Sequence, residues 1–392
     1  MPVSRREFLG TALLGGLAAM QSADAAARKP RRPNLVFIMT DNQGAWTLGA
    51  YGNPDIRTPH IDRVAREGMR FDRAFAVNAV CSPTRASFLT GLMPSQHGVH
   101  CWLRANHAQM GPDAYSTIRE FGSISSVLAN EGYTCGLVGK WHLGDNLHPQ
   151  QGFSTWITKP HGHTTAFYDV PIIQNGRIRN EPMYTTELWT RHACQFIEQN
   201  QHNPFFLYLP YNGPYGLGRS LKKPARNRHA ATYADKTLPS FPRLAPHPWL
   251  HNNKEYLNNI RAIRRYAAEC SGVDDGVGQV LATLDRLGLD DNTLVVYTAD
   301  QGWAAASTAS GAWATTHAHS TPSTTPCTSP SSSASPAPSP QAPPATASCP
   351  PATSCPRSSP TSASPTACRA SPNPQAATSP PSCAASPSTG TT

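Results

Sequence analysis

The residue types with the clearest chemical meaning begin at Cys81, which stands four residues before Arg85 with a proline between them. This spacing predicts a cysteine in the first turn of a helix and an arginine one turn later. A helix N-terminus attracts anions, and a neighbouring arginine strengthens that preference. The pattern alone leaves two interpretations open: a buried structural cysteine, or a reactive group in an anion-binding site.

Two further groups of residues follow predicted strands. Lys140 and His142 come after a strand expected at Thr134–Val138, which would place a cation and a titratable ring at one edge of a sheet. At each of two other predicted strand ends, a residue with a side-chain carboxylate is followed by one with a side-chain amide. Such oxygen ligands suit a hard cation such as Ca²⁺. Acidic residues at strand ends are also common as caps or turns. The two pairs are Asp41 with Asn42 and Asp300 with Gln301.

The elements that must position these residues alternate between buried strands and helices. Alternation of this kind predicts an α/β fold with a mostly parallel central sheet flanked by helices. In such sheets, ligands bind beyond the carboxyl ends of the strands, which is where the two carboxylate pairs fall. The expected strands cover residues 34–40, 134–138, 204–209 and 293–298. The expected helices cover residues 58–68, 123–130, 187–199 and 255–287.

The bulk composition narrows the choice of partner. The net charge of +9 over 392 residues is mildly basic and compatible with an anionic substrate. The basic run at residues 28–32 is the one block dense enough to suggest nucleic acid, and it lies where an export signal would meet the mature chain. We therefore expect no nucleic-acid partner. The ten cysteines show neither a CxxC pair nor the spacing of a disulfide framework.

The N-terminus has the three-part layout of an export signal. Arg5 and Arg6 form a twin-arginine pattern, a modestly apolar stretch covers residues 11–20, and Ala23 and Ala25 offer a cleavage site. The apolar stretch is too short to span a membrane. We expect residues 1–27 to be a signal peptide for the twin-arginine export machinery, and the mature protein to be periplasmic or extracellular.

The two motifs around Cys81 and Lys140 resemble those of one enzyme family. Residues 79–91 resemble the signature of the type I, formylglycine-dependent sulfatases, which is built on Cys-x-Pro-x-Arg. Residues 132–144 resemble the second motif of that family, with Cys135 where Ser or Thr is usual. The resemblance covers about residues 33–303 and is to bacterial members. It implies an alkaline-phosphatase-like fold with a smaller C-terminal subdomain, which we expect this chain to lack.

The resemblance also implies a mechanism and partners. A maturation enzyme would oxidise Cys81 to formylglycine, whose hydrate is the nucleophile of the family. The substrate would be a sulfate monoester, either a small molecule or a sulfated glycan. The implied catalytic residues are Cys81, Arg85, Lys140 and His142. The implied Ca²⁺ ligands are Asp41, Asn42, Cys81, Asp300 and Gln301.

At three places the chain departs from the family pattern. Asn42 replaces the second aspartate of the first metal-binding pair, which lowers the charge of the site. Tyr215 stands where many relatives have a catalytic histidine, and His161 or His163 would have to substitute for it. The second active-site lysine, expected shortly after Gly302, is missing.

The composition changes abruptly at about residue 304. Residues 304–392 consist largely of Ser, Pro, Ala and Thr, without Leu, Ile, Val, Phe, Asp or Glu, and predict a disordered tail. Such a tail is typical of a Ser/Thr/Pro stalk. However, suitable codons for residues 305–317, read in a shifted frame, restore a Gly-Lys-His-Gly segment with the missing lysine. We therefore hypothesise a frameshift near codons 304–306.

Two alternatives to a working sulfatase stay open from the sequence. Phosphonate monoester and phosphodiester hydrolases of the same superfamily share the Cys-x-Pro-x-Arg pattern. The chain would also be compatible with an inactive, truncated sulfatase.

Overall fold

The computed structural model describes residues 32–103, 108–216, 220, 223–241, 259–302 and 321–323. All of them belong to the first of two compact units, residues 1–330; the second unit, residues 331–392, contains none of them. The predicted signal peptide, the beginning of the predicted helix at residue 255 and nearly all of the predicted tail lie outside the described residues. Within the described part, no helix is both long and apolar enough to cross a membrane.

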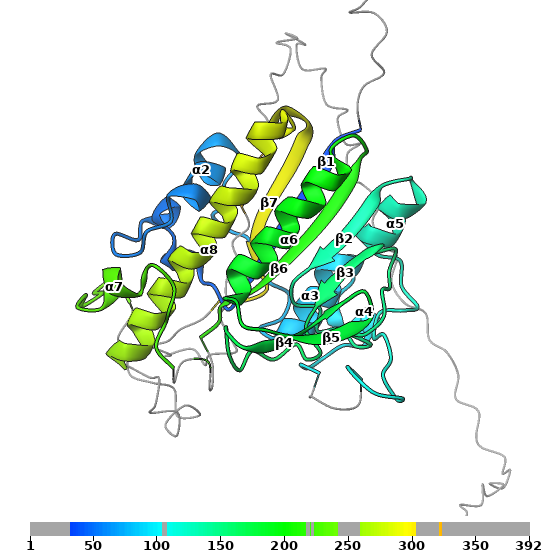
Figure 1. The fold of residues 1–392 in the computed structure, drawn as a ribbon, viewed down its shortest axis with the longest axis horizontal. Helices are drawn as coiled ribbons and strands as arrows, with labels where there is room; N and C mark the ends of the chain where they lie inside the picture. The colour runs from blue at the N-terminus through cyan, green and yellow to red at the C-terminus, as the bar shows by residue number, and fades with distance from the viewer. Residues whose placement is uncertain are drawn as a thin grey trace, which may run out of the picture. The chain divides into compact units, whose positions relative to one another are not determined.

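A mixed, mostly parallel sheet forms the centre of the fold, with the strand order β5-β4-β3-β2-β6-β1-β7-β8 (Figure 1). The central strands run parallel to one another, and the remaining strands join antiparallel at the two edges. The predicted α/β architecture is therefore confirmed. The parallel strands are β3 (Thr155–Thr158), β2 (Thr134–Val138), β6 (Phe205–Pro214), β1 (Asn34–Asp41) and β7 (Thr293–Ala299). The antiparallel strands are β4 (Val170–Gln174), β5 (Arg177–Glu181) and β8 (Thr321–Ser323).

Helices cover both faces of the sheet, which explains why its central strands are apolar without interruption. In β1, Val36 and Ile38 enter one hydrophobic core, whereas Met39 enters the other, as the two-residue period of a strand requires. The first core is covered by α2 (Pro59–Glu67), α6 (Thr185–Asn200) and α8 (Ile260–Leu287). The second is covered by α3 (Cys81–Thr90) and α5 (Ile124–Asn130), with α4 (Pro94–His97) packed on α3. Short helical turns are η1 (Ala45–Thr47), η2 (Gly49–Tyr51), α7 (Ala230–Tyr233) and η5 (Asp290–Asn292).

Strand β6 is longer than the sequence predicted. The expected strand ended at residue 209, yet β6 continues to Pro214, and every residue in it is buried. Proline and glycine usually end strands, and the extension contains Pro210, Gly213 and Pro214. The strand predicted from the sequence therefore ends too early. The strand tolerates them because its pairing with β1 shifts register between Met39 and Asp41. The extension carries the chain to Tyr215 at the same edge as the end of β1.

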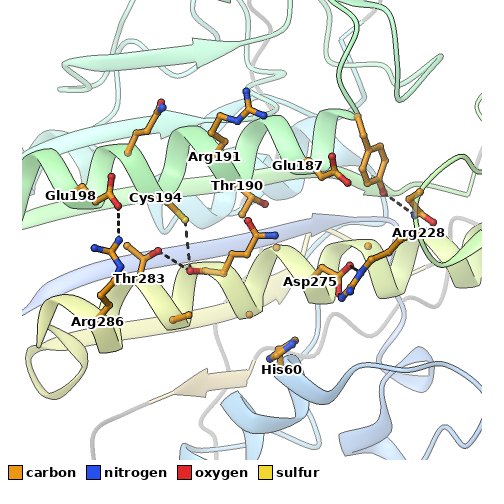
Figure 2. Close-up of a pocket in the computed structure, with 18 residues that line it drawn as sticks. His60, Glu187, Thr190, Arg191, Cys194, Glu198, Arg228, Asp275, Thr283 and Arg286 are labelled. Atoms are coloured by element: carbon orange, nitrogen blue, oxygen red, sulfur yellow. Dashed lines mark hydrogen bonds and ion pairs between the residues drawn. The ribbon is translucent and has the colours of Figure 1, made fainter.

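Helices α6 and α8 lie side by side on one face and enclose a polar groove of about 940 Å³ (Figure 2). The helices approach closely because Gly276 has no side chain: a Cβ there would lie 2.5 Å from the hydroxyl oxygen of Thr190. Charged side chains that line the groove form ion pairs, for example Arg286 of α8 with Glu198 of α6. The groove contains none of the residues predicted for the site, which lie at the carboxyl ends of the strands.

Candidate functional site

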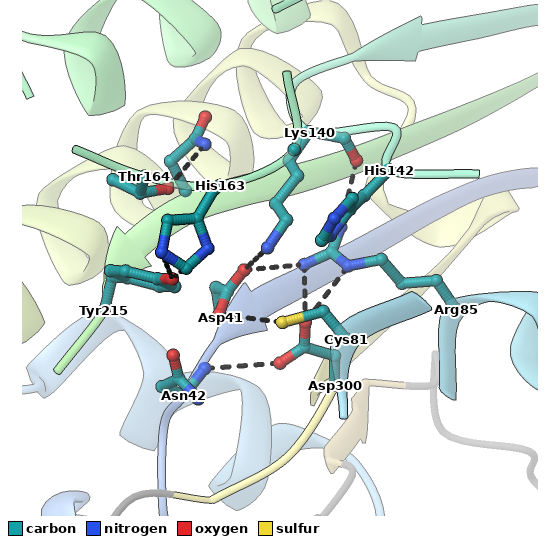
Figure 3. A network of polar contacts seen from close by, with 12 residues as sticks. Asp41, Asn42, Cys81, Arg85, Lys140, His142, His163, Thr164, Tyr215 and Asp300 are labelled. Atoms are coloured by element: carbon teal, nitrogen blue, oxygen red, sulfur yellow. Dashed lines mark hydrogen bonds and ion pairs between the residues drawn. The ribbon is translucent and has the colours of Figure 1, made fainter. Parts of the chain in front are cut away.

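Four neighbouring parallel strands bring most of the predicted site residues to one edge of the sheet (Figure 3). Because β2, β6, β1 and β7 point the same way, the residues that follow them meet there although they are far apart in sequence. Cys81 and Arg85 come from the first turns of α3. The residues at or after the strand ends are Asp41 and Asn42 (β1), Lys140 and His142 (β2), Tyr215 (β6), and Asp300 and Gln301 (β7).

The backbone turns sharply where the chain leaves these strands. Asn42, His142 and Tyr215 have positive φ angles of 58°, 63° and 39°. Non-glycine residues in this region cost of order 1–3 kcal/mol each and are concentrated at functional sites. The neighbouring Gly139, with φ of 133°, fits a place where a Cβ would come within 2.1 Å of the carbonyl oxygen of Pro210. The turn that presents Lys140 and His142 is therefore specified by a close backbone approach.

The core of the site is a fully buried group of two cations and two carboxylates. The Nε and Nη2 atoms of Arg85 donate to Oδ2 of Asp300 at 3.0 and 2.7 Å, and Nη2 also lies 3.3 Å from Oδ2 of Asp41. Lys140 pairs with the same oxygen of Asp41. Burial lowers the pKa of Lys140, but the combined charges of its acidic neighbours, Asp41 foremost, outweigh this and raise the pKa above its ordinary value. Buried charges of this kind need such mutual compensation.

Cys81 lies beside this charged group. Its Sγ atom is 3.8 Å from Oδ1 of Asp41 and accepts from the amide nitrogen of Gln301 at 3.1 Å. Burial, with a smaller effect from Asp41, raises the pKa of the Cys81 thiol to about 12. The unmodified side chain is therefore a neutral thiol at neutral pH, and neutral thiols are poor nucleophiles.

The same residues fit a hard divalent cation. Ligand atoms of Asp41, Cys81 and Asp300 all lie within 4.8 Å of one another, and all three residues are buried. The side-chain oxygens of Asn42 and Gln301 are also buried, and neither has a hydrogen-bond partner. Buried polar atoms normally have partners, so two unpartnered oxygens beside two carboxylates fit the coordination of a hard divalent cation. Asn42 thus offers an oxygen in the place of the usual aspartate.

His142 is held as a neutral ring with one unused nitrogen. Burial, with the charge of nearby Lys140, lowers its pKa well below the ordinary value. Its Nε2 atom lies 3.1 Å from the carbonyl oxygen of Leu103, so this nitrogen carries the proton and donates it. The Nδ1 atom is buried without a partner. Gly162 packs so closely on the ring that a Cβ would lie 2.0 Å from it.

A histidine does lie at the place where Tyr215 replaces the one expected. The hydroxyl of Tyr215 is 3.0 Å from Nδ1 of His163, on the side of the tyrosine reached by the segment after β3. Burial, and then Lys140, lowers the pKa of His163 to about 4, whereas burial raises that of Tyr215 well above 10. The tyrosine therefore keeps its proton, and its oxygen can accept from Nδ1 when that nitrogen carries the proton of the neutral ring. The ammonium of Lys140 lies 5.5 Å from the centre of the Tyr215 ring.

Comparison with known families identifies the chain. The sulfatase family model matches residues 33–327, which include every site residue described above. The chain belongs to the sulfatase family. The matched region includes the Cys-x-Pro-x-Arg segment that begins at Cys81.

Three relatives illustrate the similarity of this sulfatase to known proteins. It is 32% identical over 308 residues to the N-acetylgalactosamine-6-sulfatase of Mus musculus, covering 71% of this chain and 52% of that protein. It is 26% identical over 358 residues to the N-acetylglucosamine-6-O-sulfatase of Bacteroides thetaiotaomicron, covering 74% and 62%. The crystal structure of YidJ from Bacteroides fragilis matches with a TM-score of 0.64 and 25% identity, covering 76% and 70%. The chain thus spans about half the length of the first curated relatives.

We expect Ca²⁺ to stabilise this sulfatase through the oxygen ligands around Cys81. At a hundredfold excess over its dissociation constant, a ligand specific for the folded state adds about 2.7 kcal/mol, which raises the melting temperature by several degrees. Replacing Asp300 with asparagine should shrink the difference between melts in Ca²⁺ and in EDTA. Asp145→Asn is the control, because Asp145 pairs with His148 away from the cluster. Equal differences in both variants would contradict this assignment.

Proposed function

We propose that this sulfatase hydrolyses sulfate monoesters of carbohydrates. The observation that carries the proposal is that two buried cations, Arg85 and Lys140, contact the carboxylates beside Cys81 at the edge of the sheet. Two of the relatives described above are named for the 6-sulfates of N-acetylgalactosamine and N-acetylglucosamine. These names support a sulfated amino sugar as the substrate of this chain.

The chemistry of the reacting group follows from the family. Formylglycine made from Cys81 by a maturation enzyme supplies a hydroxyl nucleophile when hydrated, and a bound Ca²⁺ supplies Lewis acidity beside it. The residues that would hold the cation are Asp41, Asn42, Asp300 and Gln301, together with the modified side chain at position 81. Arg85 keeps both carboxylates in fixed orientations, because its guanidinium contacts Asp41 and Asp300 at once.

The other residues of the site supply charge and proton transfer. Lys140 would neutralise negative charge on the sulfate oxygens in a pocket from which water is excluded. His142 would accept a proton from the nucleophile at its unused Nδ1 atom, since its other nitrogen is held by Leu103. The Tyr215 hydroxyl, backed by His163, would donate a hydrogen bond to the leaving oxygen where relatives use a histidine.

The same proposal includes export. The twin-arginine pattern at residues 1–27 supports transport to the periplasm or beyond, and with it a substrate met outside the cytoplasm.

The experiment that tests the function compares ester types. The full chain, produced together with a formylglycine-generating enzyme, is assayed on p-nitrophenyl sulfate, on an N-acetylhexosamine 6-sulfate, and on a phosphodiester and a phosphonate monoester. We expect kcat/KM on the sulfate esters to exceed that on the phosphorus esters by on the order of tenfold or more, about 1.4 kcal/mol in the transition state.

The reverse preference would identify a phosphonate monoester or phosphodiester hydrolase. Before the assay, the gene is sequenced across codons 300–320, because the frameshift hypothesis predicts that a corrected frame restores the Gly-Lys-His-Gly segment. An unchanged sequence together with no turnover of any ester would support an inactive sulfatase.

A further inference from the structure

Arg265, in the second turn of α8, is a buried cation whose guanidinium is mostly unused. Its side chain is 4% exposed, and its Nε and Nη1 atoms have no hydrogen-bond partner. The neighbouring carboxylate of Glu269 lies 3.7 Å from Nη2, beyond a normal hydrogen bond, and it accepts instead from the Tyr184 hydroxyl. Burial raises the pKa of Glu269 to about 7, so this carboxylate neutralises Arg265 only in part at neutral pH.

Arg265 lines a small cavity whose wall also includes the Tyr168 hydroxyl and two further basic residues. The cavity measures about 260 Å³, and Lys223 and Arg226 add two further cations to its wall. Its acidic wall residue, Asp169, is 3.3 Å from Arg226. The hydroxyl of Tyr168 is buried without a partner, and the guanidinium of Arg226 lies 3.9 Å above the Tyr168 ring. Most of the wall surface is apolar, and its polar part is mainly cationic.

The cavity adjoins the catalytic site through one stretch of chain. Residues 165–169 line it and begin two positions after His163, which contacts Tyr215. Phe167 belongs both to the cavity wall and to the small hydrophobic cluster that contains Tyr215. The guanidinium carbon of Arg265 lies 5.4 Å from the centre of the Phe167 ring. The two sites thus share a wall.

The size and the donors of the cavity indicate the class of ligand. Pockets for whole small molecules measure roughly 300–1,000 Å³, so a cavity of about 260 Å³ suits a single group. A planar guanidinium with free N–H groups matches the oxygens of a carboxylate or a sulfate. A buried arginine without such a partner is costly, whereas an anion in the cavity would compensate its charge.

We propose that the cavity lined by Arg265, Arg226, Lys223 and Tyr168 is an oxyanion-binding site beside the catalytic centre. Its ligand is a sulfate or carboxylate group. This group is either a free anion or, if the proposed function holds, a second acidic group on the sulfated glycan whose ester lies in the catalytic site.

Binding of inorganic sulfate tests the site without relying on catalysis. The full chain is titrated with sodium sulfate by calorimetry, as wild type and as Arg265→Met. We expect the substitution to weaken or remove one class of sulfate sites by about tenfold or more. Arg261→Met is the matched control, because Arg261 is exposed one turn earlier on the same helix and loses the same charge.

Sulfate affinities that are equal in wild type and both variants would overturn the proposal. Thermal melts accompany each titration. Arg265→Lys provides a second variant, which keeps the positive charge but lacks the planar guanidinium and its several N–H donors. We expect this lysine variant to bind sulfate with an affinity between those of the wild type and Arg265→Met. If both Arg265 variants lose affinity only in proportion to lost folded protein, a purely structural role for Arg265 replaces the binding site.

Kinetics distinguish the two sources of the anion. The ratio of kcat/KM on a disulfated or carboxylated amino-sugar sulfate to that on p-nitrophenyl sulfate is compared between Arg261→Met and Arg265→Met. A ratio about tenfold lower in Arg265→Met assigns the site to a second acidic group of the substrate. An unchanged ratio with weakened sulfate binding assigns it to free anion. A lack of turnover in every variant would count against the proposed function and leaves the calorimetric result intact.

Discussion

Replacing Cys81 with alanine will abolish sulfate ester hydrolysis, lowering kcat by on the order of 10³-fold or more. The reason is that position 81 provides the nucleophile of the family, and no other described side chain in the cluster offers a hydroxyl or thiol beside both Asp41 and Gln301. Because the side chain is small and the helix begins normally at this residue, the variant should remain folded. The measurement is the initial rate on p-nitrophenyl sulfate after maturation of the wild type.

Cys135→Ala provides the matched control for this experiment. Cys135 is buried like Cys81, in strand β2, but its sulfur contacts the carbonyl oxygens of Ser125 and Tyr133. Its loss should change kcat by less than a factor of a few and cost about 1 kcal/mol of stability. Comparable losses of activity in the two variants would remove Cys81 from its proposed role.

Replacing Arg85 with methionine will lower the free energy of unfolding by about 3–5 kcal/mol in the absence of divalent cations. The loss leaves Asp300 without its cation and Asp41 with Lys140 alone, in a group that is entirely buried. Burying an uncompensated carboxylate costs more than the ion pair contributed. Urea denaturation in EDTA measures the effect.

The control for Arg85 is an arginine in an exposed ion pair. Arg63 contacts Glu67 and Asp285, and its side chain is 35% exposed, so Arg63→Met should cost less than about 1 kcal/mol. A similar cost for both substitutions would show that the buried group is not the main source of stability at this edge of the sheet.

The sequence allowed much of the fold to be predicted, because the central strands are buried on both faces. A strand that meets helices on either side must be apolar throughout, and this makes segments such as β1 and β7 easy to recognise. Strand β5 at one edge of the sheet and its neighbour β4 were not predicted. In β5, most side chains are exposed and Arg177 and Arg179 interrupt any apolar pattern, so its pairing with β4 depends on contacts that a local pattern does not contain.

The site residues fall into two groups: those placed by a predicted strand, and those placed only by tertiary packing. Residues that directly follow predicted strands, such as Asp41 and Lys140, could be assigned to one edge of the sheet before the structure was known. His163 could not, because it lies in an irregular segment after β3 and reaches Tyr215 through tertiary packing. Arg265 gave no signal at all: on a helix rich in arginine, its burial depends on the side chains that cover it.

The cluster around Cys81 joins residues of very high sequence separation, since Arg85 and Asp300 lie 215 positions apart. Contacts of that kind form late in folding, because the chain must first close the long loop between them. Strand β7, which ends just before Asp300, is among the last described strands to leave the ribosome. We expect Cys81, which is buried in the folded chain, to be accessible to other proteins until β7 docks beside β1. An enzyme that oxidises this cysteine would therefore act before folding is complete, and the rate at which β7 docks would set the interval for the modification.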